Sequence, residues 1–273
     1  MPSLQLTPQL FAVFAQLVEE ECGLHYGPSD GPLFESKLVA QASELGFESL
    51  LDFYYRLRYD DPDGVERRAL VQALVVHETY LFRELLPLEQ LCDGYLTATV
   101  RERGKARVWS AACSTGEEPT TLAILLEQRG LLDQVEIVAS DLSAGAVTKA
   151  RAGVFGRRAL RDGHPPALAA RYLEQGPRGI IATDRVRAAI EFRTINLFDE
   201  PAVRELGAFD AILCRNVLIY FRDEQIVRVV RLLREQLAPR GVFLVGISES
   251  LLRFGTTMIC EERGGAFFYR RAS

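Results

Sequence analysis

Residues 108–119 read VWSAACSTGEEP and carry the clearest structural signal in the chain. The apolar, β-favouring start runs into a series of small residues, and a Gly-Glu-Glu-Pro step then opens a helical pattern that continues through Leu126. A strand, a tight turn of small residues and a helix N-terminus, in this order, are typical of the first unit of a Rossmann-like sheet. We therefore expect a ligand site at this turn.

Two acids at the start of the predicted helix limit what that ligand can be. A nucleotide-binding G-x-G-x-x-G turn offers bare backbone N–H groups to phosphates, whereas Glu117 and Glu118 would repel a phosphate. The expected ligand is neutral or cationic, and S-adenosylmethionine fits because a sulfonium and an ammonium replace the phosphates of a nucleotide. Acids and a proline are also favoured at any helix start, so an ordinary first turn remains the alternative.

Composition excludes several classes of protein. A net charge of −5 gives no whole-molecule attraction to nucleic acid or to an anionic membrane, although local basic patches remain possible. No apolar run approaches the roughly 18 residues of a membrane span. The five cysteines have no metal-ligand spacing, and no secretory leader is recognisable. We predict a cytoplasmic protein with no metal, no nucleic-acid partner and no insertion into a membrane.

The first part of the chain has only helical periodicity. Thr7 and Pro8 have the positions of an N-cap and an N1 residue, and the apolar pattern that follows ends at Gly23. A length of 273 residues accommodates one large α/β domain and a smaller one. We predict an all-helical N-terminal domain over residues 1–88, with further helices over residues 32–45, 47–59 and 65–76.

From Lys105 onward, short β-rich runs alternate with helical stretches, which predicts a sheet covered on both faces. Residues 89–273 should form a Rossmann-like, doubly wound, mostly parallel sheet that ends in an antiparallel hairpin around Gly264-Gly265. Glycines and prolines interrupt residues 156–187, which we interpret as a small insertion with a short strand pair over 179–186, or as a long surface connection. The expected strands cover residues 108–113, 135–140, 190–195, 209–214 and 242–247, and the expected helices cover 119–129, 143–151 and 223–237.

Polar residues follow several of the predicted strands. Asp141 ends the second strand, where an acid can accept both ribose hydroxyls of an adenosine, although it could equally cap the next helix. Asn196 can present a donor and an acceptor to an adenine edge, or simply turn the chain. Tyr220 follows another strand end and could also be a half-buried core aromatic.

Four motifs together resemble the chemotaxis receptor methyltransferases of the CheR family, in the order in which that family has them. The resemblance extends from about Leu10 to Arg270. The motifs are HETYLFRE over residues 77–84, WSAACSTGEEP over 109–119, CRNVLIYF over 214–221 and GISES over 246–250.

The resemblance implies methyl transfer from S-adenosylmethionine to glutamate side chains on the cytoplasmic helical bundle of a chemoreceptor. The products would be a methyl ester and S-adenosylhomocysteine, and no metal would take part. Arg83 and Tyr220 match the family positions nearest the reacting methyl, and the acid of the Glu117-Glu118 pair that binds the cofactor is left open. The cofactor contacts carried over by motif are His77, Thr79, Arg83, Glu117, Asp141, Asn196, Leu197, Arg215 and Asn216.

Elementary chemistry agrees with this reading. A glutamate is ionised at neutral pH and attacks the methyl group in line, so the reaction needs no general base. An arginine fork and a phenol donor suit the aiming of a carboxylate. Cys113 and Cys214 lie in apolar strand patterns, where cysteine is usually a small hydrophobe rather than a nucleophile.

The chain departs from the family at a few positions. His77 replaces the usual asparagine, Thr120 replaces an aromatic residue, and the helix around residues 37–43 is poorer in arginine than the family's receptor-facing helix. The insertion, which in some relatives is a β-subdomain that grips a receptor tail, is short and proline-rich, which disfavours tail binding. We expect the protein to be a monomer. The alternatives to receptor methylation are a cofactor-sensing adaptor that transfers no methyl group and a methyltransferase that acts on another carboxylate.

Overall fold

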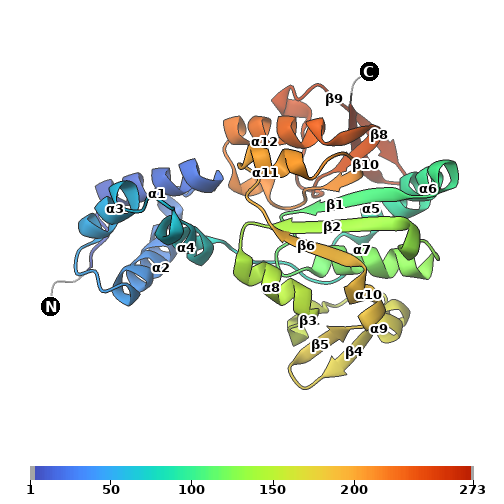
Figure 1. Ribbon diagram of the computed structural model, residues 1–273, viewed down its shortest axis with the longest axis horizontal. Helices are drawn as coiled ribbons and strands as arrows, with labels where there is room; N and C mark the ends of the chain where they lie inside the picture. The colour runs from blue at the N-terminus through green and yellow to red at the C-terminus, as the bar shows by residue number, and fades with distance from the viewer. Residues whose placement is uncertain (1–3, 272–273) are drawn as a thin grey trace. The chain divides into compact units, whose positions relative to one another are not determined.

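The computed structural model describes residues 4–271 and divides them into two compact units (Figure 1). The first unit comprises residues 4–76 together with Tyr220–Gln225, and the second comprises residues 77–219 and 226–271. Residues 77–88 thus pack with the second unit, although the sequence predicts them at the end of the helical domain. The predicted division into domains at residue 88 stays a prediction.

The first unit is helical, as expected. Thr7 caps the first helix by accepting a first-turn N–H, and Gly23 ends that helix in the left-handed region with φ 77°. One fully buried phenylalanine from each of the first three helices lies in the core: Phe14, Phe34 and Phe53. The helices are α1 (Pro8–Cys22), α2 (Gly31–Glu44), α3 (Leu50–Tyr59) and α4 (Val65–Leu74).

A short segment from the middle of the chain belongs to this helical unit. Phe221 forms an isolated antiparallel bridge with Leu24, and the Tyr220 carbonyl accepts the His25 N–H at 2.8 Å. The chain therefore joins the helical unit twice, once through its N-terminal residues and once through Tyr220–Gln225.

The second unit contains a seven-stranded sheet in the order β6-β2-β1-β7-β8-β10-β9. The first five strands are parallel, and β10 and β9 add an antiparallel hairpin, which confirms the predicted fold class. The strands are β1 (Ala106–Ala111), β2 (Val135–Asp141), β6 (Ile190–Thr194), β7 (Phe209–Leu213), β8 (Leu237–Leu244), β9 (Met258–Arg263) and β10 (Ala266–Arg271).

The order of the strands determines where a ligand can bind. From β1 the chain passes to β2 and β6 on one side, and it returns to the other side as β7 and β8. This reversal is a topological switch point, and ligands of open α/β sheets bind beyond the carboxyl ends of the strands that flank it. Connections after β1, β2, β6, β7 and β8 all leave from this edge.

Helices surround the sheet, and several of them were not predicted. Trp109 of β1 is fully buried, as the central strand of a sheet covered on both faces requires. The helical residues 85–103, which precede β1, were not predicted as separate elements. The helices of this unit are α5 (Leu85–Gln90), a π-helix (Leu91–Leu96), α6 (Thr97–Arg103), α7 (Glu117–Gln128), α8 (Ala144–Ala152), α9 (Pro166–Tyr172), α10 (Asp184–Ala188), α11 (Glu200–Glu205) and α12 (Asp223–Glu235), the last beginning in the residues that pack with the helical unit.

A second, three-stranded antiparallel sheet forms from the predicted insertion and lies apart from the large sheet at the bottom of Figure 1. Its order is β3-β5-β4, with β3 (Val154–Phe155), β4 (Leu173–Gly176) and β5 (Gly179–Ala182). The expected strand pair over 179–186 is wrong, because residues 179–182 form one strand that pairs with both neighbours and α10 follows. Neither proline nor shortness prevents this β-subdomain, so the argument against tail binding fails.

None of the helices in residues 4–271 combines the length and the apolar character that crossing a membrane requires.

Candidate active site at the carboxyl ends of the strands

The turn after β1 is held by the carboxylate of Asp141, the last residue of β2. Its Oδ2 accepts the Ser114 N–H at 2.8 Å, and its Oδ1 accepts the Ser143 N–H at 2.9 Å. Helix α8 is capped by the Ser143 side chain, so the alternative role of Asp141 as the cap is wrong. Burial raises the pKa of Asp141, against the effect of the two N–H donors.

Strained backbone is concentrated at this edge of the sheet. Among the described residues, six non-glycine residues have positive φ, and five of them lie here. Such conformations persist only where the surroundings impose them, and they cluster at functional sites. Gly116, with φ 94°, has no room for a side chain, because a Cβ would lie 2.8 Å from Ala150 Cβ. The five residues are Phe82, Glu84, Ala112, Ser114 and Asn216.

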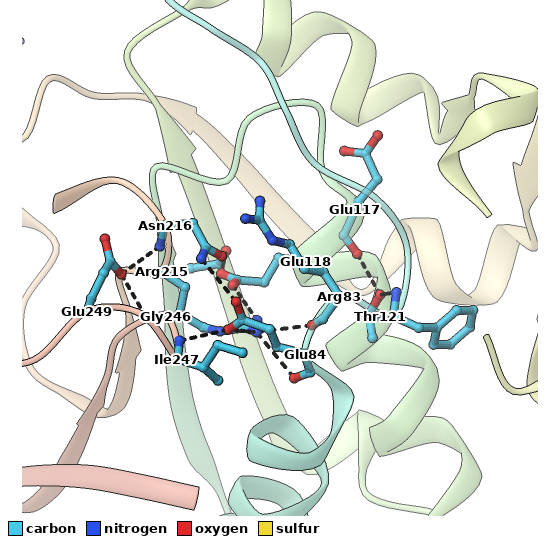
Figure 2. Close-up of polar contacts among 12 residues, drawn as sticks. Arg83, Glu84, Glu117, Glu118, Thr121, Arg215, Asn216, Gly246, Ile247 and Glu249 are labelled. Carbon is cyan, nitrogen blue, oxygen red and sulfur yellow. Dashed lines mark hydrogen bonds and ion pairs between the residues drawn. The ribbon is translucent and has the colours of Figure 1, made fainter. Parts of the chain in front are cut away.

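The two acids at the start of α7 have different surroundings, and their carboxylates point in different directions in Figure 2. Glu118 accepts the Ser110 hydroxyl at 2.7 Å and the Arg215 guanidinium at 2.9 Å. Glu117 is buried as well, but among the described residues its carboxylate accepts only the Thr115 hydroxyl, at 2.7 Å. Burial raises the pKa of Glu117. Glu118 is thus used within the protein, and Glu117 keeps acceptor capacity.

Arg215, two residues after β7, is the centre of a buried ion-pair network (Figure 2). Its side chain is 2% exposed, and it lies 2.9 Å from Glu118 and 3.0 Å from Glu84. The same guanidinium also donates to the Arg83 carbonyl at 3.0 Å. Arg215 therefore joins the segment before α5 to the start of α7. Its Nε has no acceptor within residues 4–271.

Glu84 completes this network from the turn before α5. Its carboxylate accepts the Asn216 side-chain amide and the Ile247 N–H, both at 3.1 Å. Burial acts to raise the pKa of Glu84, but Arg215 and these two donors hold the pKa below its ordinary value. Glu84 is ionised at neutral pH, and it balances the buried charge of Arg215.

Glu249 holds together the loops that follow β7 and β8. Its Oε2 accepts the N–H groups of Asn216 and Gly246, each at 2.7 Å, and its Oε1 accepts the Ile219 N–H at 3.2 Å. Burial raises the pKa of this carboxyl. A Cβ on Gly246 would lie 2.5 Å from Asn216 Nδ2 and 2.8 Å from Glu249 Oε2, so these contacts favour glycine at the first position of the GISES motif.

The segment before α5 contributes three of the candidate residues. His77 Nδ1 lies 3.3 Å from the Ser114 hydroxyl, at the turn after β1, and Thr79 is partly exposed. Arg83 donates to the Glu78 carbonyl at 3.0 Å. No carboxylate in the described part of the chain forms an ion pair with Arg83, so the alternative pairing with Glu84 or Glu117 is wrong.

Asn196 and Leu197 follow β6, next to the turn that Asp141 holds. The Ile195 N–H donates to the Asp141 carbonyl at 3.0 Å, which brings the ends of β6 and β2 together. Asn196 Oδ1 accepts the Phe198 N–H at 3.0 Å, and Leu197 is buried. The structure thus brings eight of the candidates, all except Thr79 and Tyr220, to the strand-end edge or to segments bonded to it.

Tyr220 belongs to the helical unit, while the other nine candidates belong to the sheet unit. Its role beside the methyl group stays a prediction. Cys113 and Cys214 are buried, and burial raises the pKa of both thiols well above the ordinary value. Both cysteines are therefore small core residues, as expected. Among residues 4–271, no group of three or more His, Cys, Asp or Glu side chains could hold a metal ion.

Comparison with known proteins shows the family to which the chain belongs. Residues 77–263 match the family described as CheR methyltransferase, SAM binding domain. The chain belongs to the CheR methyltransferase family. It is 34% identical over 261 residues to chemotaxis protein methyltransferase 2 of Vibrio cholerae, covering 94% of this chain and 90% of that protein. It is 35% identical to the chemotaxis protein methyltransferase of Vibrio parahaemolyticus, covering 92% of each, and 34% identical to chemotaxis protein methyltransferase 1 of Pseudomonas aeruginosa, covering 88% and 90%.

The site of this CheR family member fits S-adenosylmethionine. Burial raises the pKa of Glu117 and of Asp141. Hydroxyl donors or a nearby cation would stabilise the ionised form of each carboxylate. S-adenosylmethionine carries both kinds of group, with hydroxyls on its adenosine and positive charges on its methionine part. Phosphate would meet these same acids and be repelled. The chain is thus an S-adenosylmethionine-dependent methyltransferase by family and by the chemistry of its strand ends.

Sequence reasoning missed two residues that build this CheR site. Glu84 contacts the side chains of Arg215 and Asn216, and Glu249 accepts the backbone N–H of Asn216. Neither acid was predicted as a site residue, yet together they hold three strand-end segments in place. Glu249 lies in the GISES motif and Glu84 directly follows Arg83, so the sequence does place both acids inside recognisable motifs. Only the fold shows what those acids bind.

Proposed function

We propose that this chain transfers the methyl group of S-adenosylmethionine to glutamate side chains on the cytoplasmic helical bundle of a chemoreceptor. The observation that carries the proposal is that the Arg83 guanidinium has no carboxylate partner in the described chain, while the Arg83 backbone carbonyl is held by Arg215 of the ion-pair network. An arginine left with free donors suits an incoming carboxylate, which it can bind with two parallel hydrogen bonds.

The cofactor-binding roles follow from the contacts of each residue. Asp141 and Glu117 are the acids with acceptor capacity near the turn after β1, and we assign the ribose and the cationic part of the cofactor to them. Because Glu118 is bound by Ser110 and Arg215, the family's contact at this motif is assigned to Glu117. His77, Thr79, Asn196, Leu197 and Asn216 line the same edge in this proposal, and Arg215 acts through its Nε or its backbone.

When bound, S-adenosylmethionine supplies an electrophilic methyl group that a carboxylate oxygen takes in line, while the electrons of the carbon–sulfur bond stay on sulfur. Arg83 then orients the acceptor carboxylate, and we assign to Tyr220 a hydrogen bond to that carboxylate because of its place in the CRNVLIYF motif. Neither residue has to move a proton, because the acceptor is already ionised at neutral pH. The product is a neutral ester.

The remaining parts of the proposal concern the setting. We infer that the protein works in the cytoplasm, as a monomer, without a metal and without nucleic acid, on receptors whose helical bundles lie there. The names of the three curated relatives described above, each a chemotaxis protein methyltransferase, support this setting.

A methylation assay tests the proposal. The protein is incubated with methyl-labelled cofactor and receptor cytoplasmic fragments, and base-labile methanol is collected. We expect label in the fragment and none in a control fragment whose candidate glutamates are changed to alanine. Cofactor binding without base-labile label would indicate an adaptor instead. Label in small carboxylic acids but not in any receptor fragment would indicate another acceptor.

A further inference from the structure

The region around the small sheet has a charge opposite to that of the whole chain. Between Arg151 and Arg187 there are eight arginines and three acidic residues, although the protein as a whole has a net charge of −5. A local excess of this size is not explained by the fold of a three-stranded sheet. It indicates a surface with a binding role.

Part of this positive charge is already used within the protein. Arg185 forms ion pairs with Glu127 and Asp133, and Arg187 pairs with Asp184. By contrast, Arg157, Arg158 and Arg178 are exposed and form no ion pair with any residue of 4–271.

The unused arginines lie beside the segment that carries Arg83. The Ala159 carbonyl accepts the Leu81 N–H at 2.8 Å. Arg161 lies 4.0 Å from the centre of the Tyr80 ring and 3.3 Å from the Glu78 carboxylate. Residues 157–161 are therefore attached along residues 78–81, immediately before Arg83.

Arg178 lies in the β4–β5 turn, whose backbone packs against the strand that precedes Arg157. Its neighbour Gly179 packs so closely on Phe155 that a Cβ there would lie 2.1 Å from the Phe155 carbonyl oxygen. Phe155 is two residues before Arg157. We refer to Arg157, Arg158, Arg161 and Arg178 as the rim arginines.

We propose that the rim arginines dock the acidic helix that carries the acceptor glutamate. This inference rests on the proposed function and adds to it the surface that selects the acceptor. The acceptor is a carboxylate by the nature of the reaction, and a helix rich in glutamate presents further carboxylates one or two turns away. Charges within about 10 Å of each other still interact at moderate salt. Methylation removes one negative charge, so the product helix is held less tightly than the substrate helix.

The charge of helix α2 gives no reason to place the acidic helix there instead. The α2 residues 37–43 contain one lysine and no arginine, and that lysine donates to the Leu74 carbonyl at 3.2 Å. The rim arginines, in contrast, adjoin Arg83 within one compact unit. They can hold an acidic helix while Arg83 orients one of its carboxylates.

A charge-reversal experiment tests the proposal in the full-length protein. The test variant is Arg157→Glu with Arg158→Glu. The matched control is Arg101→Glu with Arg231→Glu, because these two arginines are also exposed, lie on α6 and α12, and form no ion pair within the described residues. Steady-state methylation of a receptor cytoplasmic fragment is measured at low and high salt, with cofactor affinity measured beside it.

We expect the test variant to raise KM for the fragment by about tenfold at low salt, since attraction becomes repulsion at two positions. Its kcat and cofactor affinity should stay within about twofold of the parent, and the difference should shrink at high salt. The control should behave as the parent does. Arg157→Gln with Arg158→Gln, which only removes the charges, should give an intermediate KM and guards against a folding defect caused by the new acids.

Three results would overturn the docking surface. The first is an equal KM for the test variant and the control. The second is a test variant that loses binding to phosphatidylglycerol vesicles while its KM is unchanged, which would assign the rim to a membrane surface. The third is a parent protein that methylates no receptor fragment, in which case the proposed function fails together with this inference. A parent that methylates the fragment and a test variant that does so equally well would refute the docking surface alone.

Discussion

Glu118 and Arg215 form a buried ion pair, with 2.9 Å between Oε2 and Nη1 and with 15% and 2% of their side chains exposed. Removing one partner of such a pair leaves a buried charge with less compensation. We expect Glu118→Ala to lower the free energy of unfolding by about 3 kcal/mol, as measured by urea denaturation. Glu102→Ala is the control, because its partner Arg240 is 81% exposed and the pair should contribute under about 1 kcal/mol. Equal losses in the two variants would contradict the buried network.

Glu117 should respond in the opposite way, although it is the next residue. It takes no part in the Arg215 network, and burial disfavours its ionised form. Glu117→Gln should therefore leave stability unchanged or slightly raised, and it should weaken cofactor binding by about 1–3 kcal/mol, the scale of a hydrogen bond to a charged group. Calorimetric titration with S-adenosylmethionine measures the affinity. Unchanged affinity would return Glu117 to the role of an ordinary first-turn acid.

The raised pKa of Glu117 also predicts a pH dependence with a definite sign. A carboxyl whose pKa is raised by folding contributes stability that is present below the unfolded pKa and is lost as the pH rises through the folded pKa. The unfolding free energy of Glu117→Gln, relative to the parent, should therefore increase over that interval. Urea denaturation of both proteins at a series of pH values measures it. A difference that is flat, or that falls with pH, would mean that the carboxyl is not disfavoured by burial.

Asp141 should affect the cofactor more than the fold. Asparagine keeps one of the two acceptor oxygens, so Asp141→Asn loses one of the N–H bonds from Ser114 and Ser143 and presents a donor to the ribose. We expect cofactor binding to weaken by about 1–3 kcal/mol. Ser143→Ala is the control: loss of the α8 cap should lower stability by about 1 kcal/mol without changing affinity. Similar affinities for the two variants would demote Asp141 to a structural link.

The periodicity of the sequence predicts most of the fold, because long elements bury one face or both. The helix from Pro8 to Gly23 and the strands β1 and β2 lie within a few residues of their predicted positions. The strands β3 and β4 of the small sheet were missed because β3 has two residues and β4 has four, too few to show alternation. Residues 85–103 were missed because a π-helical turn interrupts the helical period.

The residues of the candidate site were also predicted only in part. The positions of Asp141 at the end of a strand and of Glu117 at the start of a helix could be predicted, and the structure has both residues there; their contacts with the cofactor stay predictions. Glu84 could not, because its partner Arg215 is 131 residues away in the sequence and the contact exists only in the folded chain. The choice between Glu117 and Glu118 also needed the structure, because both occupy the first turn of α7.

Arg83 gives the sharpest test of the mechanism. Among the described residues its guanidinium donates to the Glu78 carbonyl and pairs with no carboxylate, while its own carbonyl is fixed by Arg215. Changing the side chain should therefore leave the network intact. If Arg83 orients the acceptor, Arg83→Ala should reduce single-turnover methylation at least about 100-fold, with a much smaller loss of cofactor affinity.

Arg83→Lys distinguishes a two-pronged contact from a simple charge. A lysine supplies the positive charge but cannot form two parallel hydrogen bonds to one carboxylate, so we expect only partial recovery of turnover. If Arg83 instead holds the carboxylate of the cofactor, affinity and turnover should fall together in both variants. The two measurements, cofactor affinity by calorimetry and methylation in a single turnover, separate these cases. An alanine variant with near-normal turnover would exclude Arg83 from the chemistry, and the acceptor would then have to be oriented by Tyr220 or by the rim arginines alone.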